Sequence, residues 1–249
     1  MKKESSRASY ADPKLREQKA GDKMQNNYYA KSLNAQKLWQ VYDPEIPRIS
    51  RYLERETAFV RERLKKTDTV LELAAGYGRI MKELAPFVRS ITGIEISDDN
   101  VHFGEQYLKN IPNTSLLTMD VHDIDCSNSF DAVLCLQNGL SAVKAEVPEI
   151  LAAKVMKALK NGGKAYFSTY HPKFWEHRLA WFQEQAKKGL IGEIDMEKTK
   201  NGVIICKDGF RATTHSITDF EKIGRSTGCR WQIAEVDDSS IFLVIEKQD

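Results

Sequence analysis

The chain has few of the residues and none of the runs that mark secreted, zinc-binding or membrane-spanning proteins. Its 249 residues include four cysteines, and no two of them have C-x-x-C spacing, so neither zinc nor a disulfide framework is indicated. No apolar run approaches the ~20 residues of a membrane-spanning helix. The first residues, MKKESSRASYADPK, lack the apolar core of a secretory signal. These absences predict a protein of the reducing cytoplasm with no membrane partner.

An excess of charge of one sign is also missing. Lysine and arginine number 37 and aspartate and glutamate 35, which leaves a net charge of +2. This balance gives no electrostatic reason to expect nucleic acid as a partner. Hydrophobic residues make up 41% of the chain, enough for a sizeable core. The length suits an α/β domain with additions.

The most informative stretch is an apolar strand that runs into a glycine-bearing turn and then a helix. The strand is residues 69–73, the turn carries Gly76 and Gly78, and apolar residues at helical spacing follow. Glycines let a backbone come close to a ligand, and the helix N-terminus behind them offers free N–H groups. A second apolar strand ends on Glu95. The stretch therefore predicts a nucleotide-type ligand.

Two such ligands compete. A dinucleotide site requires G-x-G-x-x-G, but Met81 occupies the third glycine position here. The run VLELAAGYG, residues 70–78, instead resembles the first motif of the class I S-adenosylmethionine-dependent methyltransferases, E/D-x-G-x-G-x-G. Glu72 supplies its acidic residue, and Ala74 replaces its first glycine. The resemblance favours S-adenosylmethionine over NAD as the cofactor.

The remaining chain alternates strands and helices, which predicts a parallel sheet with helices on both faces. Further strands are expected at residues 115–119, 130–136, 164–169, 229–236 and 241–247. The resemblance implies a seven-stranded, mostly parallel, Rossmann-like sheet whose last strand is antiparallel. Residues 1–23 are expected to form a flexible basic arm and residues 24–66 a helical lid. The methyltransferase domain is then residues 67–249, with an insertion at about 173–214 after the fifth strand.

The resemblance also implies a cofactor site built from four strand ends. In that family the turn after the first strand surrounds the methionine part of the cofactor. The acidic residue ending the second strand accepts both ribose hydroxyls, and the one ending the third meets the adenine amine. The end of the fourth strand lines the methyl group. The residues at these positions are Glu72, Ala74, Gly76, Gly78, Glu95, Ile96, Asp120, Val121, Leu136, Gln137 and Asn138.

Methyl transfer does not require a catalytic base, because the sulfonium group is already activated. Candidate bases are Tyr28 and Tyr29 in the first helical segment and Tyr170 and His171 after the fifth strand. The alternatives are core packing for Tyr28 and Tyr29 and a simple turn position, before Pro172, for the histidine. The other histidines have no ligand-like spacing, so no metal is expected.

The acceptor is predicted to be a small molecule. Enzymes that methylate exocyclic amines of nucleic acids resemble one another in an Asn/Asp-Pro-Pro-Tyr/Phe motif, whereas residues 137–140 here read QNGL. The chain also lacks the Pro-Cys dipeptide of cytosine C5 enzymes. The N-terminal helices and the insertion would then form the acceptor pocket. Two alternatives stay open: an RNA or protein methyltransferase that docks through the basic arm, and a non-catalytic α/β binding protein. The oligomeric state is not predicted.

Overall fold

The computed structural model describes residues 28, 32–143 and 148–248. The expected basic arm at residues 1–23 and the candidate base Tyr29 lie outside this part of the chain. Among the described residues, no helix is both long and apolar enough to cross a membrane.

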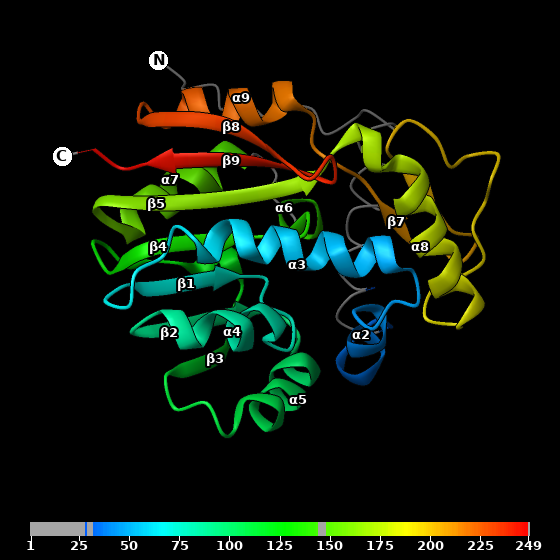
Figure 1. The fold of residues 1–249 in the computed structure, drawn as a ribbon, viewed down its shortest axis with the longest axis horizontal. Helices are drawn as coiled ribbons and strands as arrows, with labels where there is room; N and C mark the ends of the chain where they lie inside the picture. Colours follow the sequence, from blue (N-terminus) through cyan, green and yellow to red (C-terminus); the bar gives the residue numbers. More distant parts are fainter. Residues whose placement is uncertain (1–27, 29–31, 144–147, 249) are drawn as a thin grey trace, which may run out of the picture.

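A seven-stranded sheet forms the centre of the molecule, in the order β3-β2-β1-β4-β5-β9-β8 (Figure 1). Strands β1 to β5 pair in parallel, and β9 is antiparallel to both of its neighbours, β5 and β8. This arrangement confirms the predicted sheet. The strands are β1 (Thr69–Leu73), β2 (Ser90–Glu95), β3 (Thr114–Thr118), β4 (Phe130–Cys135), β5 (Leu159–Tyr170), β8 (Arg230–Val236) and β9 (Ser240–Glu246).

Most of the predicted strand boundaries lie within one residue of the observed ones, and two differences affect the interpretation of the chain. Strand β3 ends at Thr118, so Asp120 does not end it but instead caps the 3-10 helix η2 (Val121–Asp123) by accepting from the His122 N–H. Strand β5 begins at Leu159, which pairs with Phe130 ahead of an irregularity in the ladder. The helix that precedes β5 therefore ends at Ala158.

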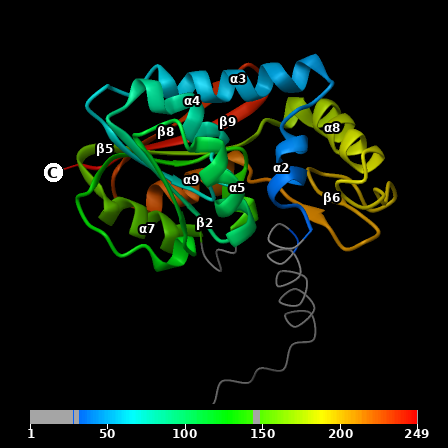
Figure 2. The ribbon, with the colours of Figure 1, turned by 90° about the horizontal axis from the view of Figure 1, so that it is seen from below.

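Helices cover both faces of the sheet, as Figure 2 shows. On one face lie α3 (Pro47–Arg61), α4 (Arg79–Leu84) and α5 (Asp98–Leu108), and on the other lie α7 (Pro148–Ala158) and α9 (Ile217–Ser226). Local signals explain their ends: Pro47 occupies the first turn of α3, Ser97 caps α5, and Ser216 with Asp219 forms a capping box on α9.

The segment expected as a lid divides into two parts with different packing. Helix α3 belongs to the sheet layer, because Val60 is fully buried and the Phe59 ring lies 4.3 Å from that of Phe242. Helix α2 (Ala35–Val41) instead lies beyond the carboxyl ends of the strands. The lid that we carry forward as a proposal is therefore α2 and its flanking residues, without α3.

The insertion packs onto the N-terminal helices at the same end of the sheet (Figure 1). It contains η3 (Pro172–Phe174), α8 (Trp175–Lys187) and the small hairpin of β6 (Ile204–Ile205) and β7 (Arg211–Ala212). A separate apolar cluster joins it to α3, and the Trp181 indole N–H donates to the Val41 carbonyl of α2 at 3.2 Å. The insertion and the N-terminal helices together cover the end of the sheet where parallel α/β folds bind ligands.

Candidate functional site

A cavity of about 520 Å³ opens at the carboxyl ends of the parallel strands. Every residue predicted to bind the cofactor lines it except Gly78. The separate strand ends are thus brought together by the sheet. Gly78 begins α4 with φ 83°, and a Cβ atom there would come within 2.6 Å of Leu108. Its contribution is to the shape of the turn rather than to the cavity wall.

The turn after β1 is left-handed at three residues: Ala74, Gly76 and Gly78 have φ of 53°, 55° and 83°. Glycine adopts this conformation without steric cost, whereas a left-handed alanine costs about 1–2 kcal/mol. The Ala74 departure from the family motif therefore keeps the glycine-type backbone and adds local strain.

Glu95 holds this turn from the end of β2. Its carboxylate accepts hydrogen bonds from the Gly76 N–H at 3.0 Å, the Ser97 N–H at 3.1 Å and the Asn100 side-chain amide at 3.2 Å. Its side chain lines the cavity although the residue is only 6% exposed. A charged acceptor fixed by several donors is suited to binding ligand hydroxyls.

Glu72 and Arg79 are two ionisable side chains on the cavity wall, and Glu72 is buried. Burial raises the pKa of Glu72 to about 8, although the guanidinium of Arg79 opposes the rise. One Glu72 carboxylate oxygen has no hydrogen-bond partner, and neither do Nε and Nη2 of Arg79, whose Nη1 pairs with Glu83. Unused donors and acceptors of opposite charge suit a zwitterionic ligand group. The sequence reasoning missed Arg79, although its place directly after Gly78 was a signal.

Asp120 lies at the other end of the cavity and is held by its neighbour His122. One carboxylate oxygen accepts from the His122 N–H at 2.9 Å and lies 2.6 Å from the ring Nδ1. Burial alone would raise the pKa of Asp120, but these hydrogen bonds outweigh it and leave that pKa below its ordinary value. The group is therefore an ionised acceptor at neutral pH.

The turn after β4 carries two consecutive left-handed residues, Gln137 and Asn138, with φ of 53° and 60°. The Gln137 N–H donates to the Ser168 hydroxyl at 2.8 Å and to the Glu56 carboxylate at 3.2 Å. The Asn138 amide accepts from the Thr169 hydroxyl and donates to the Thr213 carbonyl at 2.7 Å. Contacts from distant elements therefore hold a conformation that neither residue favours alone.

Glu56 on α3 is a buried acid, although many of the residues around it in the sequence are charged. The Ser168 hydroxyl donates to it at 2.5 Å. Burial raises its pKa to about 7, although this hydrogen bond and that from Gln137 oppose the rise. Burial on α3 could have been suspected from the helical spacing of its apolar neighbours. Its hydrogen-bond partner Ser168 could not have been predicted in this way, because Ser168 lies on β5.

Of the described candidate bases, Tyr170 lines the cavity, whereas Tyr28 and His171 do not. The Tyr28 hydroxyl donates to Asp208 at 2.7 Å, and its ring packs 4.9 Å from that of Phe210. Burial and the Asp208 carboxylate raise the pKa of Tyr28 above its ordinary value, which opposes proton acceptance through the phenolate. His171 is buried behind the end of β5 and contacts Glu235 instead. We do not carry either residue into the proposed mechanism.

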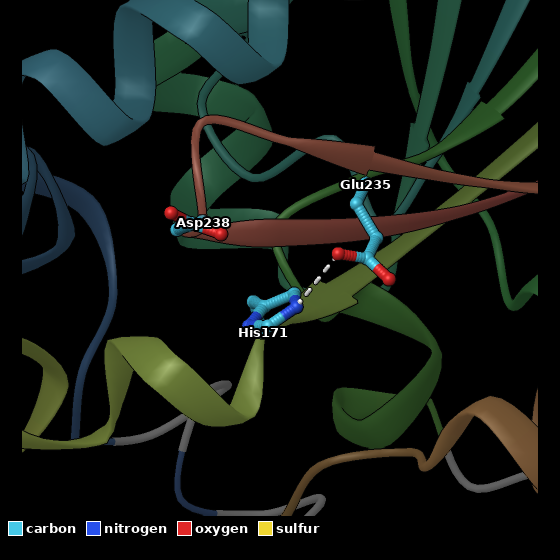
Figure 3. Close-up of side chains that lie close together, drawn as sticks. All are labelled: His171, Glu235 and Asp238. Carbon is cyan, nitrogen blue, oxygen red and sulfur yellow. Dashed lines mark hydrogen bonds and ion pairs between the residues drawn. The ribbon is translucent and has the colours of Figure 1, made fainter.

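His171, Glu235 and Asp238 lie close enough together to resemble a metal site (Figure 3). The His171 Nδ1 accepts the Lys173 N–H at 3.0 Å, so the neutral ring carries its proton on Nε2, which faces Glu235 at 3.2 Å. Asp238 pairs with the Lys173 ammonium at 2.8 Å. Both ring nitrogens and one carboxylate are thus committed to protein partners, and this arrangement opposes metal binding.

The far half of the cavity is lined by α2 and its flanking residues, by the end of β5 and by the insertion. Its wall is mostly apolar and aromatic, with a few uncharged polar groups. The residues are Leu33, Leu38, Val41, Tyr42, Tyr170, Trp181, Phe182, Gln185, Phe210, Ala212 and Thr213.

Comparison with known proteins agrees with this geometry. The methyltransferase domain family matches residues 70–163. No curated protein sequence matches the chain significantly.

Several solved structures share the fold. One is the Burkholderia thailandensis 1,6-didemethyltoxoflavin-N1-methyltransferase with bound 1,6-didemethyltoxoflavin and S-adenosylhomocysteine. It is 12% identical with a TM-score of 0.63, over 98% of this chain and 94% of that one. The DhpI–SAH complex is 16% identical to this chain and has a TM-score of 0.64. The match covers 91% of this chain and 97% of that one. The N-methyltransferase NodS from Bradyrhizobium japonicum WM9 is 12% identical and has a TM-score of 0.57. The match covers 90% of this chain and 99% of that one.

The domain match covers the glycine turn and the ends of β1, β2 and β4, and the fold extends over the whole described sheet. Residues 70–163 therefore match the methyltransferase domain family, and the described sheet has the Rossmann-like fold of solved S-adenosylmethionine-dependent methyltransferases.

Proposed function

We propose that the protein transfers the methyl group of S-adenosylmethionine, in line, to a small molecule bound in the far half of the cavity. The observation that carries this proposal is a single cavity with two different halves. One half contains the family's cofactor positions, and the other is walled by residues 33–42 and 170–213, outside the matched domain. Such appended walls suit an enclosed acceptor better than a polymer.

The cofactor half offers complementary groups for each part of S-adenosylmethionine. Glu72 and Arg79 have the free acceptor and donors that an α-ammonium and an α-carboxylate require. Glu95 is placed to accept ribose hydroxyls, and Asp120 to accept from the adenine amine. The lack of a side chain at Gly76 supports this fit, because a Cβ atom there would lie only 3.1 Å from the Leu38 side chain.

The bound cofactor would supply an activated methyl group on a sulfonium, so the protein has to align the acceptor and exclude water. Gln137 and Asn138, held by Glu56, Ser168, Thr169 and Thr213, shape the wall where the two halves meet. Tyr42 of the lid segment and Trp181 of α8 close it from the other side, with ring centroids 6.3 Å apart.

Two further observations support this proposal. The Burkholderia thailandensis enzyme was solved with a small molecule bound, and its likeness extends over nearly the whole of this chain. All four cysteines are free, which supports action in the reducing cytoplasm.

Transfer of labelled methyl from S-adenosylmethionine into a metabolite extract, compared with transfer into RNA and protein, tests the proposal. We expect label in the small-molecule fraction. Label found only in RNA or protein would show that the acceptor is a polymer and would refute the small-molecule proposal. Binding of S-adenosylmethionine without any transfer would favour the non-catalytic alternative.

A further inference from the structure

We infer that the acceptor is an uncharged, flat ring compound that presents a hydrogen-bond donor and an acceptor side by side to the amide of Gln185. This inference rests on the proposed function and names the substrate class of the same cavity. It follows from the distribution of charge, from the use of the aromatic ring faces, and from the state of Gln185.

Among the described residues, the carboxylate and guanidinium side chains that line the cavity are Glu72, Arg79, Glu95 and Asp120. They lie at the ends of β1 and β2, just after β3, and at the start of α4. No charged side chain lines the wall that the described parts of α2, α8 and β7 contribute. Moving an ionised group from water into such a wall is costly unless it finds a partner, so a neutral acceptor is favoured.

The aromatic wall does not form a cage for a cation, because arginines already occupy the ring faces. The Arg79 guanidinium lies 5.1 Å from the Tyr42 ring centroid. That of Arg178 lies 4.5 Å from Tyr170 and 5.4 Å from Phe182. A cationic acceptor would be repelled by both guanidiniums.

Arg178 does not offer an anion site either. It is 1% exposed and lies behind the wall rather than in it. Its Nη1 donates to the Gly202 carbonyl at 2.8 Å, and its Nη2 donates to the carbonyls of Ala212 and Thr213. These donors hold the β6–β7 hairpin in place, so an anion in the cavity would meet aromatic rings.

Gln185 is a polar group of the acceptor half that makes no side-chain hydrogen bond within the described part of the chain. It lines the cavity and is only 3% exposed. A buried amide left without partners costs about 1–3 kcal/mol. A ligand with adjacent N–H and C=O groups pairs with both ends of it.

The rings of Trp181 and Phe182 lie within one helical turn of Gln185 on α8, and Phe210 faces Phe182 with centroids 6.0 Å apart. Aromatic walls favour a flat partner, because ring pairs gain from offset or edge contacts. A neutral lactam ring combines this shape with the donor and acceptor that Gln185 requires.

The test uses the full-length protein saturated with S-adenosylhomocysteine, and calorimetry with four probes of similar size. These are quinolin-2(1H)-one as the lactam, naphthalene as the ring alone, quinoline-2-carboxylate as the anion and N-methylquinolinium as the cation. We expect the lactam to bind at least about tenfold more tightly than each of the others. Equal or tighter binding of either ion, or no binding of the lactam, would overturn the inference.

Two variants on α8 separate recognition from packing. Gln185→Met keeps the length and apolar stem of the side chain and should reduce lactam affinity about tenfold, to near that of naphthalene. Gln183→Met changes an exposed glutamine on the same helix and should leave it unchanged. An unaltered lactam preference in Gln185→Met would refute the role of Gln185. S-adenosylhomocysteine affinity is measured first in each protein. If the wild-type protein does not bind S-adenosylhomocysteine, the proposed function is refuted. If it binds S-adenosylhomocysteine but fails the lactam test, only this inference is refuted.

Discussion

The side-chain amide of Asn100 donates to the Glu95 carboxylate at 3.2 Å, and the carbonyl oxygen of the same amide accepts from the Ala35 N–H at 2.6 Å. One buried side chain on α5 therefore connects the proposed ribose acceptor with the first residue of the lid helix α2. Asn100 therefore links the cofactor half of the cavity to the proposed lid helix through two hydrogen bonds.

Replacement of Glu95 by alanine should lower the affinity for S-adenosylmethionine at least about tenfold. Hydrogen bonds to a charged group contribute roughly 1.5–3 kcal/mol each, and 1.4 kcal/mol is about a factor of ten. The free energy of unfolding should also fall, by about 2 kcal/mol, because Gly76, Ser97 and Asn100 lose their acceptor. Calorimetry and urea denaturation measure the two effects. Unchanged cofactor affinity would remove Glu95 from the binding site.

Replacement of Asn100 by alanine should reduce turnover more than cofactor affinity. The variant breaks the connection to Ala35 but leaves the Glu95 carboxylate in place with two of its donors. Asn110→Ala, at an exposed position after the same helix, is the matched control. The comparison requires turnover and S-adenosylhomocysteine affinity in both variants. Equal turnover in the two would show that the connection to α2 has no part in transfer.

Cofactor affinity should rise with pH between about 6 and 8 through Glu72. Burial raises the pKa of this carboxyl to about 8, and only its ionised form attracts an α-ammonium group. The same raised pKa stabilises the free protein below the ordinary carboxyl pKa, and this contribution is lost as the pH rises to about 8. Calorimetry across this range with Glu72→Gln as the comparison tests the assignment. A slope that persists in Glu72→Gln would locate the titration elsewhere.

Replacement of Ala74 by glycine should stabilise the protein by about 1 kcal/mol, because it relieves a left-handed alanine at φ 53°. Ala75→Gly is the control, because Ala75 does not have a positive φ and its side chain is buried. That change should destabilise by about 0.5–1 kcal/mol, because glycine loses more freedom on folding. Urea denaturation compares the two, and destabilisation by Ala74→Gly would show that the alanine is unstrained.

A truncation beginning at Pro44 should fold and lose methyl transfer, while some S-adenosylhomocysteine affinity remains. It removes Leu38, Val41 and Tyr42 from the cavity wall but keeps α3 on the sheet. A truncation beginning at Asp68 also removes Val60 and Phe59 and should not give a folded protein. Circular dichroism and turnover distinguish the outcomes. Full turnover without α2 would refute the lid.

The sequence by itself determined the order of the sheet elements and the position of the glycine turn. Those features depend on local signals: apolar runs, left-handed glycines, and caps such as Ser97 and Ser216 that satisfy nearby backbone groups. The strand ends predicted to bind the cofactor line one cavity because parallel strands share an edge.

The tertiary structure alone decided which other side chains reach that cavity. Glu56 bonds to Ser168 across 112 residues, and Asn138 to Thr213 across 75. Arg79, Tyr42 and Gln185 line the wall, whereas Tyr28 and His171 do not. No local pattern encodes these outcomes, because burial and pairing at such separations depend on how α2, α3 and α8 pack together over the sheet.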